Sequence, residues 1–199
     1  MIPRQTLLWL IFLALVAAAM GIYAWQLSES NAPGGAFVAD NRPVAPPVAG
    51  PRELVNLYVA YDDPGVLRSQ PTTVPLPTER QQRAQELLRA LMSVYLAKSS
   101  PHPLAPEADI RSVYLIDPGI AVIDVNSAFA DAHRSGILVE ELTIASLVQT
   151  VAENIPGVTR IKILVEGKER ETLAGHADLT TFYDVSVVSQ LAGQLAEKQ

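Results

Sequence analysis

The feature that most constrains this chain is a run of 19 residues without any charge, Leu7 to Trp25. As an α-helix the run would be roughly 29 Å long, about the thickness of the hydrocarbon layer of a bilayer. Trp9 lies near one end and Tyr23 near the other, as expected for aromatic side chains at the two membrane interfaces. The run therefore predicts a transmembrane helix, and a buried core helix is disfavoured because the run offers no polar face.

The flanking charges predict how this helix is oriented. Arg4 precedes the run and Glu29 follows it, so the N-terminus is expected in the cytoplasm and the rest of the chain outside it. A competing interpretation is a cleaved signal peptide, with Ala17 to Ala19 as the cleavage site. Apolar residues continue beyond that point to Trp25, which favours an uncleaved, single-pass anchor in the cytoplasmic membrane.

The composition changes abruptly after the apolar run. Eight prolines and glycines interrupt the stretch before Arg52, which cannot bury enough apolar area to offset its ordering entropy. We therefore expect residues 1–27 to be a transmembrane anchor, 28–52 a disordered Pro/Gly-rich linker, 53–183 one α/β domain and 184–199 a C-terminal tail.

The first half of the predicted domain contains one strand and one helix. Residues from Leu54 to Tyr61 alternate in polarity, which predicts a strand, and Asp62 to Gly65 should form the turn that ends it. An irregular, proline-containing connection is expected from there to Pro77. Thr78 to Gln81 has the form of a capping box, which predicts a helix that ends before Ser99–Pro101.

The middle of the domain predicts a hairpin and a second long helix. Ile110 to Ile116 and Ile120 to Val125 are apolar, β-branched runs on either side of a Pro-Gly turn. Asn126 or Ser127 should cap a short helical turn that runs to Ala132. Glu140 to Ile155 then has the apolar stripe of a long helix, with carboxylates at its positive end.

The last part of the domain predicts two more strands. Val158 to Val165 should point Ile161 inward and Arg160 and Lys162 outward, and a tight turn at Glu166-Gly167 leads into a strand from Glu169 to Leu173. The predicted order is β-α-β-β-α-β-β, an α/β (α+β) domain whose helices cover an antiparallel or mixed sheet. The tail after Tyr183 is expected to form a weak helix or no regular structure.

Charge and residue types exclude several classes of function. The net charge is −6, which argues against a nucleic-acid partner because binding phosphates needs a basic face. The absence of cysteine excludes disulfides, thiol catalysis, Cys-ligated metals and the lipid-bearing cysteine of a bacterial lipoprotein. His102, His133 and His176 lack the spacing of metal ligands, and the chain has no Gly-rich phosphate loop or nucleophile elbow. We therefore predict no catalytic residue, no metal, no cofactor and no enzymatic activity.

The carboxylates have structural interpretations. The pair Asp62-Asp63 could bind a cation, but a turn is the simpler interpretation, and Glu140-Glu141 fits a helix start. Asp124 lies at the end of an apolar strand and is expected to accept hydrogen bonds from the amides of Asn126 and Ser127. His176 and Asp178 lie two residues apart and are expected to interact and stiffen a loop, which is half of a catalytic triad at most.

Taken together, these segments resemble a GerMN domain, the module of a spore-germination protein. The resemblance covers about residues 55–183, and no single piece of it is specific. Its pieces are the strand Val55–Val59, the run Val122–Val125, the helix end Gln149–Glu153 with Pro156–Val158, the turn Glu166–Lys168 and the loop Leu173–Asp178. Two departures stand out. Asn126 replaces the serine that is common in the family, and only one copy of the domain is present, whereas the germination protein has two.

The resemblance implies a non-catalytic, extracytoplasmic domain with the architecture of ring-building motifs, tied in the family to envelope assembly, sporulation and spore germination. Sporulation itself does not follow for this chain. We expect a scaffold or protein-interaction module of the cell envelope that binds another envelope protein or itself, in part through Arg160 and Lys162. The alternative is a module that binds peptidoglycan or another glycan through the Gly175–Asp178 loop, and a wall hydrolase using Asp124 or His176 is disfavoured. The candidate interaction or family-motif positions are Asp124, Arg160, Lys162, Gly167, Gly175, His176 and Asp178.

Overall fold

The structure is a computed structural model that describes residues 20, 46–48, 50–116 and 118–196. The chain divides into two compact units, residues 1–42 and 43–199, and every strand and helix named below belongs to the second. The predicted membrane span lies outside the described residues except for Met20, as does most of the predicted linker. No helix within the described residues is long and apolar enough to cross a membrane.

The first sheet is an antiparallel hairpin of β1 (Arg52–Tyr61) and β2 (Val66–Pro75). Strand β1 was predicted, but the expectation of an irregular connection to Pro77 is wrong. The sequence of β2 does not predict a strand, because it is rich in polar residues and contains two prolines. Pro71 lies opposite Asn56, whose N–H points away from β2 to the side chain of Asn154, so this pair needs no N–H from the proline.

The free edge of β1 is closed by helix side chains instead of another strand. The N–H of Asn56 donates to Asn154 Oδ1 (3.3 Å), that of Tyr58 to Thr150 Oγ1 (3.0 Å), and that of Ala60 to the Tyr95 hydroxyl (2.9 Å). An unpaired strand edge is a template for another chain, and these three bonds remove it.

The second sheet has the strand order β3-β4-β5-β6. Strands β3 (Ile110–Ile116) and β4 (Ile120–Val125) form the predicted antiparallel hairpin, β5 (Arg160–Val165) runs parallel to β4, and β6 (Tyr183–Asp184) pairs with the start of β5. The predicted strand from Glu169 to Leu173 is wrong. Residues 166–182 form a loop with two isolated bridges, and its polar residues leave only Leu173, Ala177 and Leu179 buried.

Four helices accompany the sheets in the described part of the chain: α2 (Arg80–Tyr95), α3 (Ser127–Asp131), α4 (Ile137–Asn154) and α5 (Val185–Ala196). The two long predicted helices and the Asn126 cap of α3 are confirmed. Glu79, and not Thr78, caps α2, because its carboxylate accepts the N–H groups of Gln81 and Gln82. The predicted tail is in large part the helix α5, whose Val188 and Ala192 join the hydrophobic core.

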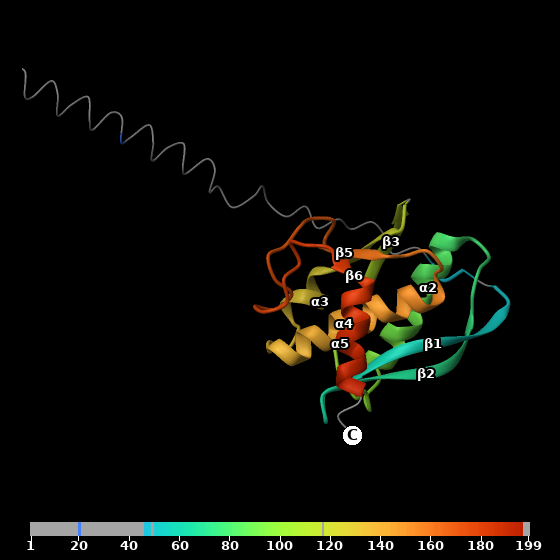
Figure 1. Cartoon of the computed structure of the whole chain (residues 1–199), viewed down its shortest axis with the longest axis horizontal. Coiled ribbons are helices and arrows are strands. Elements are labelled where there is room, and N and C mark those ends of the chain that lie inside the picture. The colour runs from blue at the N-terminus through green and yellow to red at the C-terminus, as the bar shows by residue number, and fades with distance from the viewer. Residues whose placement is uncertain (1–19, 21–45, 49, 117, 197–199) are drawn as a thin grey trace, which may run out of the picture. The chain divides into compact units, whose positions relative to one another are not determined.

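Helix α4 is the central element of the domain. It packs against β1, α2 and α5, and α2 packs in turn against β3 (Figure 1). Apolar side chains from both sheets and from α2, α3, α4 and α5 form one core. The result is a mixed α+β fold, and it places the start of α4 beside the loop 166–182.

Candidate functional site

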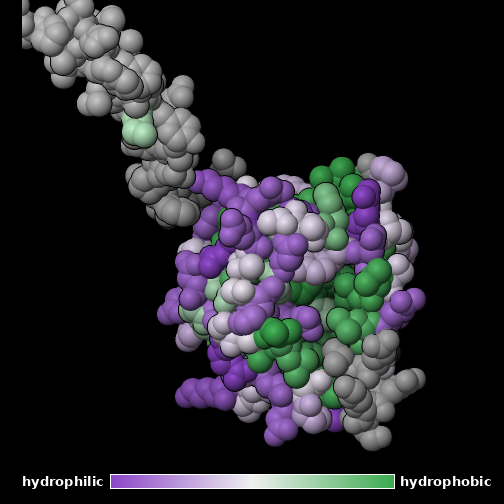
Figure 2. Space-filling view, turned by 60° about the vertical axis from the view of Figure 1, so that its left-hand side comes forward, coloured by the Kyte–Doolittle hydropathy of each residue, from purple (hydrophilic) through white to green (hydrophobic). Residues whose placement is uncertain are grey.

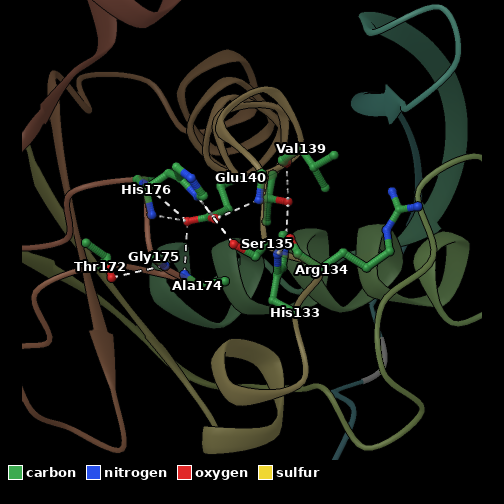
Figure 3. A network of polar contacts seen from close by, with 12 residues as sticks. His133, Arg134, Ser135, Val139, Glu140, Thr172, Ala174, Gly175 and His176 are labelled. Atoms are coloured by element: carbon green, nitrogen blue, oxygen red, sulfur yellow. Dashed lines mark hydrogen bonds and ion pairs between the residues drawn. The ribbon is translucent and has the colours of Figure 1, made fainter.

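A fully buried carboxylate, that of Glu140, ties the start of α4 to the loop that follows β5. Its Oε2 accepts the N–H groups of Ala174 (2.9 Å), His176 (3.0 Å) and Ala177 (2.9 Å). Its Oε1 accepts the N–H of Gly136 (3.1 Å) and Nδ1–H of His176 (2.8 Å). Figure 3 shows the Glu140 side chain reaching from α4 to the loop residues Ala174 and His176.

These hydrogen bonds decide the charge of Glu140. Burial alone would raise its pKa, but bonds from Ala177, Gly136, His176 and Ala174 outweigh burial and lower the pKa to about 2. The group is therefore an anion at neutral pH and a poor proton acceptor. Its role is to fix the loop, and the helix-start interpretation of Glu140 from the sequence captured only a small part of that role.

His176 does not complete a catalytic triad. Its Nδ1 faces both Glu140 Oε1 (2.8 Å) and Ser135 Oγ (3.4 Å), whereas a triad needs acid and nucleophile on opposite ring nitrogens. The predicted interaction of His176 with Asp178 is replaced, because Asp178 Oδ1 accepts the N–H (2.7 Å) and hydroxyl (2.6 Å) of Thr180. The loop is instead held by hydrogen bonds to Glu140.

The loop backbone uses two of the predicted family-motif glycines at positive φ. Gly175 has φ +117, and its N–H donates to Thr172 Oγ1 at 3.1 Å. Gly167 has φ +70, and its N–H donates to Asp124 Oδ1 at 2.7 Å. A side chain would strain the backbone at either position.

Asp124 accepts hydrogen bonds, but from partners other than the predicted ones. Besides Gly167 it contacts Arg111 Nη1 at 3.0 Å, and Arg111 also lies 3.2 Å from Glu166 Oε2. The amide of Ser127, predicted to bind Asp124, donates to Glu166 Oε1 instead (2.8 Å). This cluster closes the turn after β5 onto β4.

The predicted exposed basic face is only half present. Arg160 is exposed, but Lys162 is buried, and its Nζ donates to the carbonyl of Thr180 (2.6 Å) and lies 2.9 Å from Glu169 Oε1. Both cations lie near the ring of Phe182. The expectation that Lys162 is on an open surface is wrong because the loop 166–182 covers it.

Two histidines that the sequence treats as unrelated meet on one hydroxyl in the core. His102 Nε2 and His133 Nε2 lie 2.6 Å and 2.8 Å from Thr143 Oγ1. The other nitrogen of His102 faces Asp62 Oδ1 (2.6 Å), and that of His133 faces the carbonyl of Arg134 (2.8 Å). Arg134 also pairs with the second oxygen of Asp62, so Asp62 both begins the turn after β1 and holds a histidine.

Proton counting limits how this cluster can be satisfied. A carboxylate and a carbonyl only accept, so Nδ1 of His102 and Nδ1 of His133 each carry a proton. If both rings are neutral, both Nε2 atoms need the single hydroxyl proton of Thr143, which the carbonyl of Val139 (3.0 Å) also accepts. Burial lowers the pKa of His102 against the opposing effect of Asp62, and burial also lowers the pKa of His133. Within the described residues, no group of three or more His, Asp or Glu side chains is arranged to hold a metal ion.

An apolar groove of about 270 Å³ lies beside the Glu140-fixed loop. Helices α4 and α5 form two of its walls and the end of the loop forms the third. We name it the α4–α5 groove. Its lining residues are Glu141, Ile144, Ala145, His176, Ala177, Asp178, Thr181, Tyr183, Val187, Val188 and Leu191. Figure 2 shows hydrophobic side chains gathered around a hollow on one face of the molecule.

The fold defines a small α+β domain of two sheets, built around α4. Residues 56–171 match the family described as Germane, sporulation and spore germination. This match spans more than half of the 199 residues, so the chain belongs to the Germane family, and the predicted resemblance to GerMN domains is confirmed.

Three solved structures share similarity with the chain. A candidate lipoprotein from Clostridium perfringens is 18% identical with a TM-score of 0.43, over 68% of this chain and 88% of that one. The tandem GerMN domains of the sporulation protein GerM from Bacillus subtilis are 14% identical with a TM-score of 0.49, over 66% and 45%. The first GerMN domain of that protein is 15% identical with a TM-score of 0.46, over 65% and 94%. No curated protein matches the chain.

Proposed function

We propose that this chain is a membrane-anchored, extracytoplasmic module without catalytic activity, and that it acts in the cell envelope by binding another envelope protein. The family to which the chain belongs is described by sporulation and spore germination, which supports a role in building or operating an envelope structure. The uncharged run from Leu7 to Trp25 supports the anchor and the outside location.

The observation that carries the proposal is the α4–α5 groove next to a fixed loop. Two residues of α5 that line it, Val187 and Leu191, are 62% and 38% exposed. Apolar side chains that stay in contact with water around a concave surface are typical of protein-binding sites.

The polar groups nearby support binding over catalysis. Glu140 keeps its charge and is enclosed, so it is unsuited to transfer protons near neutral pH. His176 has its Nδ1 occupied by Glu140, and Ser135 lies at the same nitrogen. These groups hold the shape of one groove wall.

The test is photo-crosslinking of the tagged full-length protein in its own membranes, followed by mass spectrometry. A benzophenone amino acid at Val187 probes the groove, and one at Tyr114, which is also exposed, serves as the control. One dominant envelope protein crosslinked from Val187 and not from Tyr114 is the expected result. Crosslinks to wall fragments alone would contradict the proposal and favour a glycan-binding module.

A further inference from the structure

We propose that the α4–α5 groove receives an apolar side chain flanked by lysine or arginine, presented by a segment of another envelope protein. This inference rests on the proposed function and adds the chemistry of the partner. It follows from the size of the groove, the charges at its rim and the occupants that those charges disfavour.

The size of the groove fits side chains better than a whole small molecule. Its volume of about 270 Å³ lies just below the roughly 300–1,000 Å³ of small-molecule pockets. Ile144, Ala145 and Val188 form a buried apolar base, and Val187 and Leu191 form an exposed edge. One or two aliphatic or aromatic side chains inserted from a partner would cover this surface.

The rim of the groove is acidic. Glu141 and Asp178 are exposed, and hydrogen bonds from the Thr180 hydroxyl and amide lower the pKa of Asp178, so it stays charged. The pKa of the Tyr183 phenol is raised to about 12. Burial is the largest cause, and the negative charges of Asp178, Glu141 and Glu140 add to it. None of the described lining residues is a lysine or arginine.

This charge pattern disfavours two other occupants. A second copy of the chain in a two-fold contact through the groove would bring together two acidic rims, each carrying Glu141 and Asp178. An anionic lipid surface would also meet the acidic rim with like charge. A partner segment with lysine or arginine beside its apolar residue pairs with both carboxylates and fills the groove.

The fixed loop makes the groove ready for such a partner. Three backbone N–H groups of the loop, those of Ala174, His176 and Ala177, bind one oxygen of Glu140. The loop wall that carries Asp178 therefore needs little further ordering when a partner binds, and less ordering means a smaller entropic cost of association.

The first experiment measures binding of two synthetic helical peptides to the detergent-solubilised full-length protein by fluorescence anisotropy. Both peptides carry the same leucines, which are flanked by lysine in one peptide and by glutamate in the other. We expect the lysine peptide to bind about tenfold or more tightly than the glutamate peptide, and the difference to shrink with added salt. Equal affinity for the two peptides would overturn the inference.

Matched variants place the binding in the groove. Glu141→Lys reverses a rim charge, and Glu171→Lys makes the same charge change at an exposed loop position that does not line the groove. We expect Glu141→Lys to lower the affinity for the lysine peptide by about tenfold. Glu171→Lys should change that affinity by less than about twofold. Val187→Glu should lower the affinity for both peptides, because it places a charge on the apolar edge of the groove. If the two lysine variants behave alike, the groove is not the site.

The crosslinking experiment separates this inference from the proposed function. If a dominant envelope protein is crosslinked from Tyr114 but not from Val187, the proposed function as an envelope-binding module stands. The same result would overturn the inference that the groove is the binding site. Crosslinks from Val187 that persist unchanged in Glu141→Lys would overturn the charge requirement alone. Absence of any protein crosslink at both positions would overturn the proposed function and this inference together.

Discussion

The carboxylate of Glu140 and the ring of His176 lie 2.8 Å apart, although 36 residues separate them in the sequence. The same carboxylate binds three backbone N–H groups of the loop and one at the start of α4. A single buried anion therefore joins the first turn of α4 to the segment that forms one wall of the α4–α5 groove. The shape of the groove depends on this charge.

The first prediction concerns the loss of that charge. Glu140→Gln keeps the size of the side chain but removes the anion, and its amide nitrogen cannot accept from the loop N–H groups. We expect the free energy of unfolding to fall by about 2–3 kcal/mol, because hydrogen bonds to charged groups are lost in a buried site. Chemical denaturation measures the change. The control is Glu141→Gln at the exposed neighbouring position, which should change stability by less than about 0.5 kcal/mol.

The second prediction concerns acid pH. The pKa of Glu140 is about 2 in the folded chain against an ordinary value of 4.5, so the unfolded chain takes up this proton first as the pH falls. The stability that Glu140 contributes is complete above pH 4.5 and is lost progressively between pH 4.5 and 2. We expect this loss to be on the order of 3 kcal/mol. Chemical denaturation between pH 6 and 2 should show that the free energy of unfolding depends less on pH in Glu140→Gln than in the parent chain. Equal pH dependence in the two proteins would contradict the lowered pKa of Glu140.

Local patterns were enough to predict much of this fold. The hairpin of β3 and β4 consists of two apolar runs around Pro118-Gly119, so its signal lies within 16 neighbouring residues. Strand β2 was missed because Pro71 and its polar neighbours contradict a strand unless its pairing with Asn56 is known. Strand β6 could not be predicted from the sequence either, because two residues are too few to form a pattern.

The site depends on contacts between residues far apart in the sequence, so local sequence patterns could not predict it. Glu140 has a sufficient local explanation at a helix start, and its loop partners are 34–37 residues away. Thr143 lies within an apolar helical stripe, and nothing near it indicates that His102 and His133 converge on it. Lys162 alternates outward as predicted, but its burial depends on the loop 166–182.

The third prediction concerns the two histidines on Thr143. Burial lowers the pKa of His102 and of His133 below the ordinary value of 6.5, so the unfolded chain binds these protons more readily. Their contribution to stability is present above pH 6.5 and is lost as the pH falls below that value. We expect stability to decline between pH 7 and 5 and NMR titration of both rings to show midpoints below 6.5. A rise in stability over that range would contradict this, and would indicate that one ring keeps the proton that Thr143 cannot supply to both.

The fourth prediction follows from the correction at Lys162. Its Nζ is enclosed between the carbonyl of Thr180 and Glu169, so Lys162→Glu would bury a carboxylate among acceptors. We expect a loss of about 3 kcal/mol or more, because a carboxylate at this buried position would face acceptors and have no positive partner. Arg160→Glu makes the same charge change on the exposed neighbour of the same strand and should cost less than about 1 kcal/mol. Thermal unfolding of the two variants distinguishes these outcomes. If both variants are as stable as the parent chain, the side chain of Lys162 is open to solvent and the loop 166–182 does not cover it.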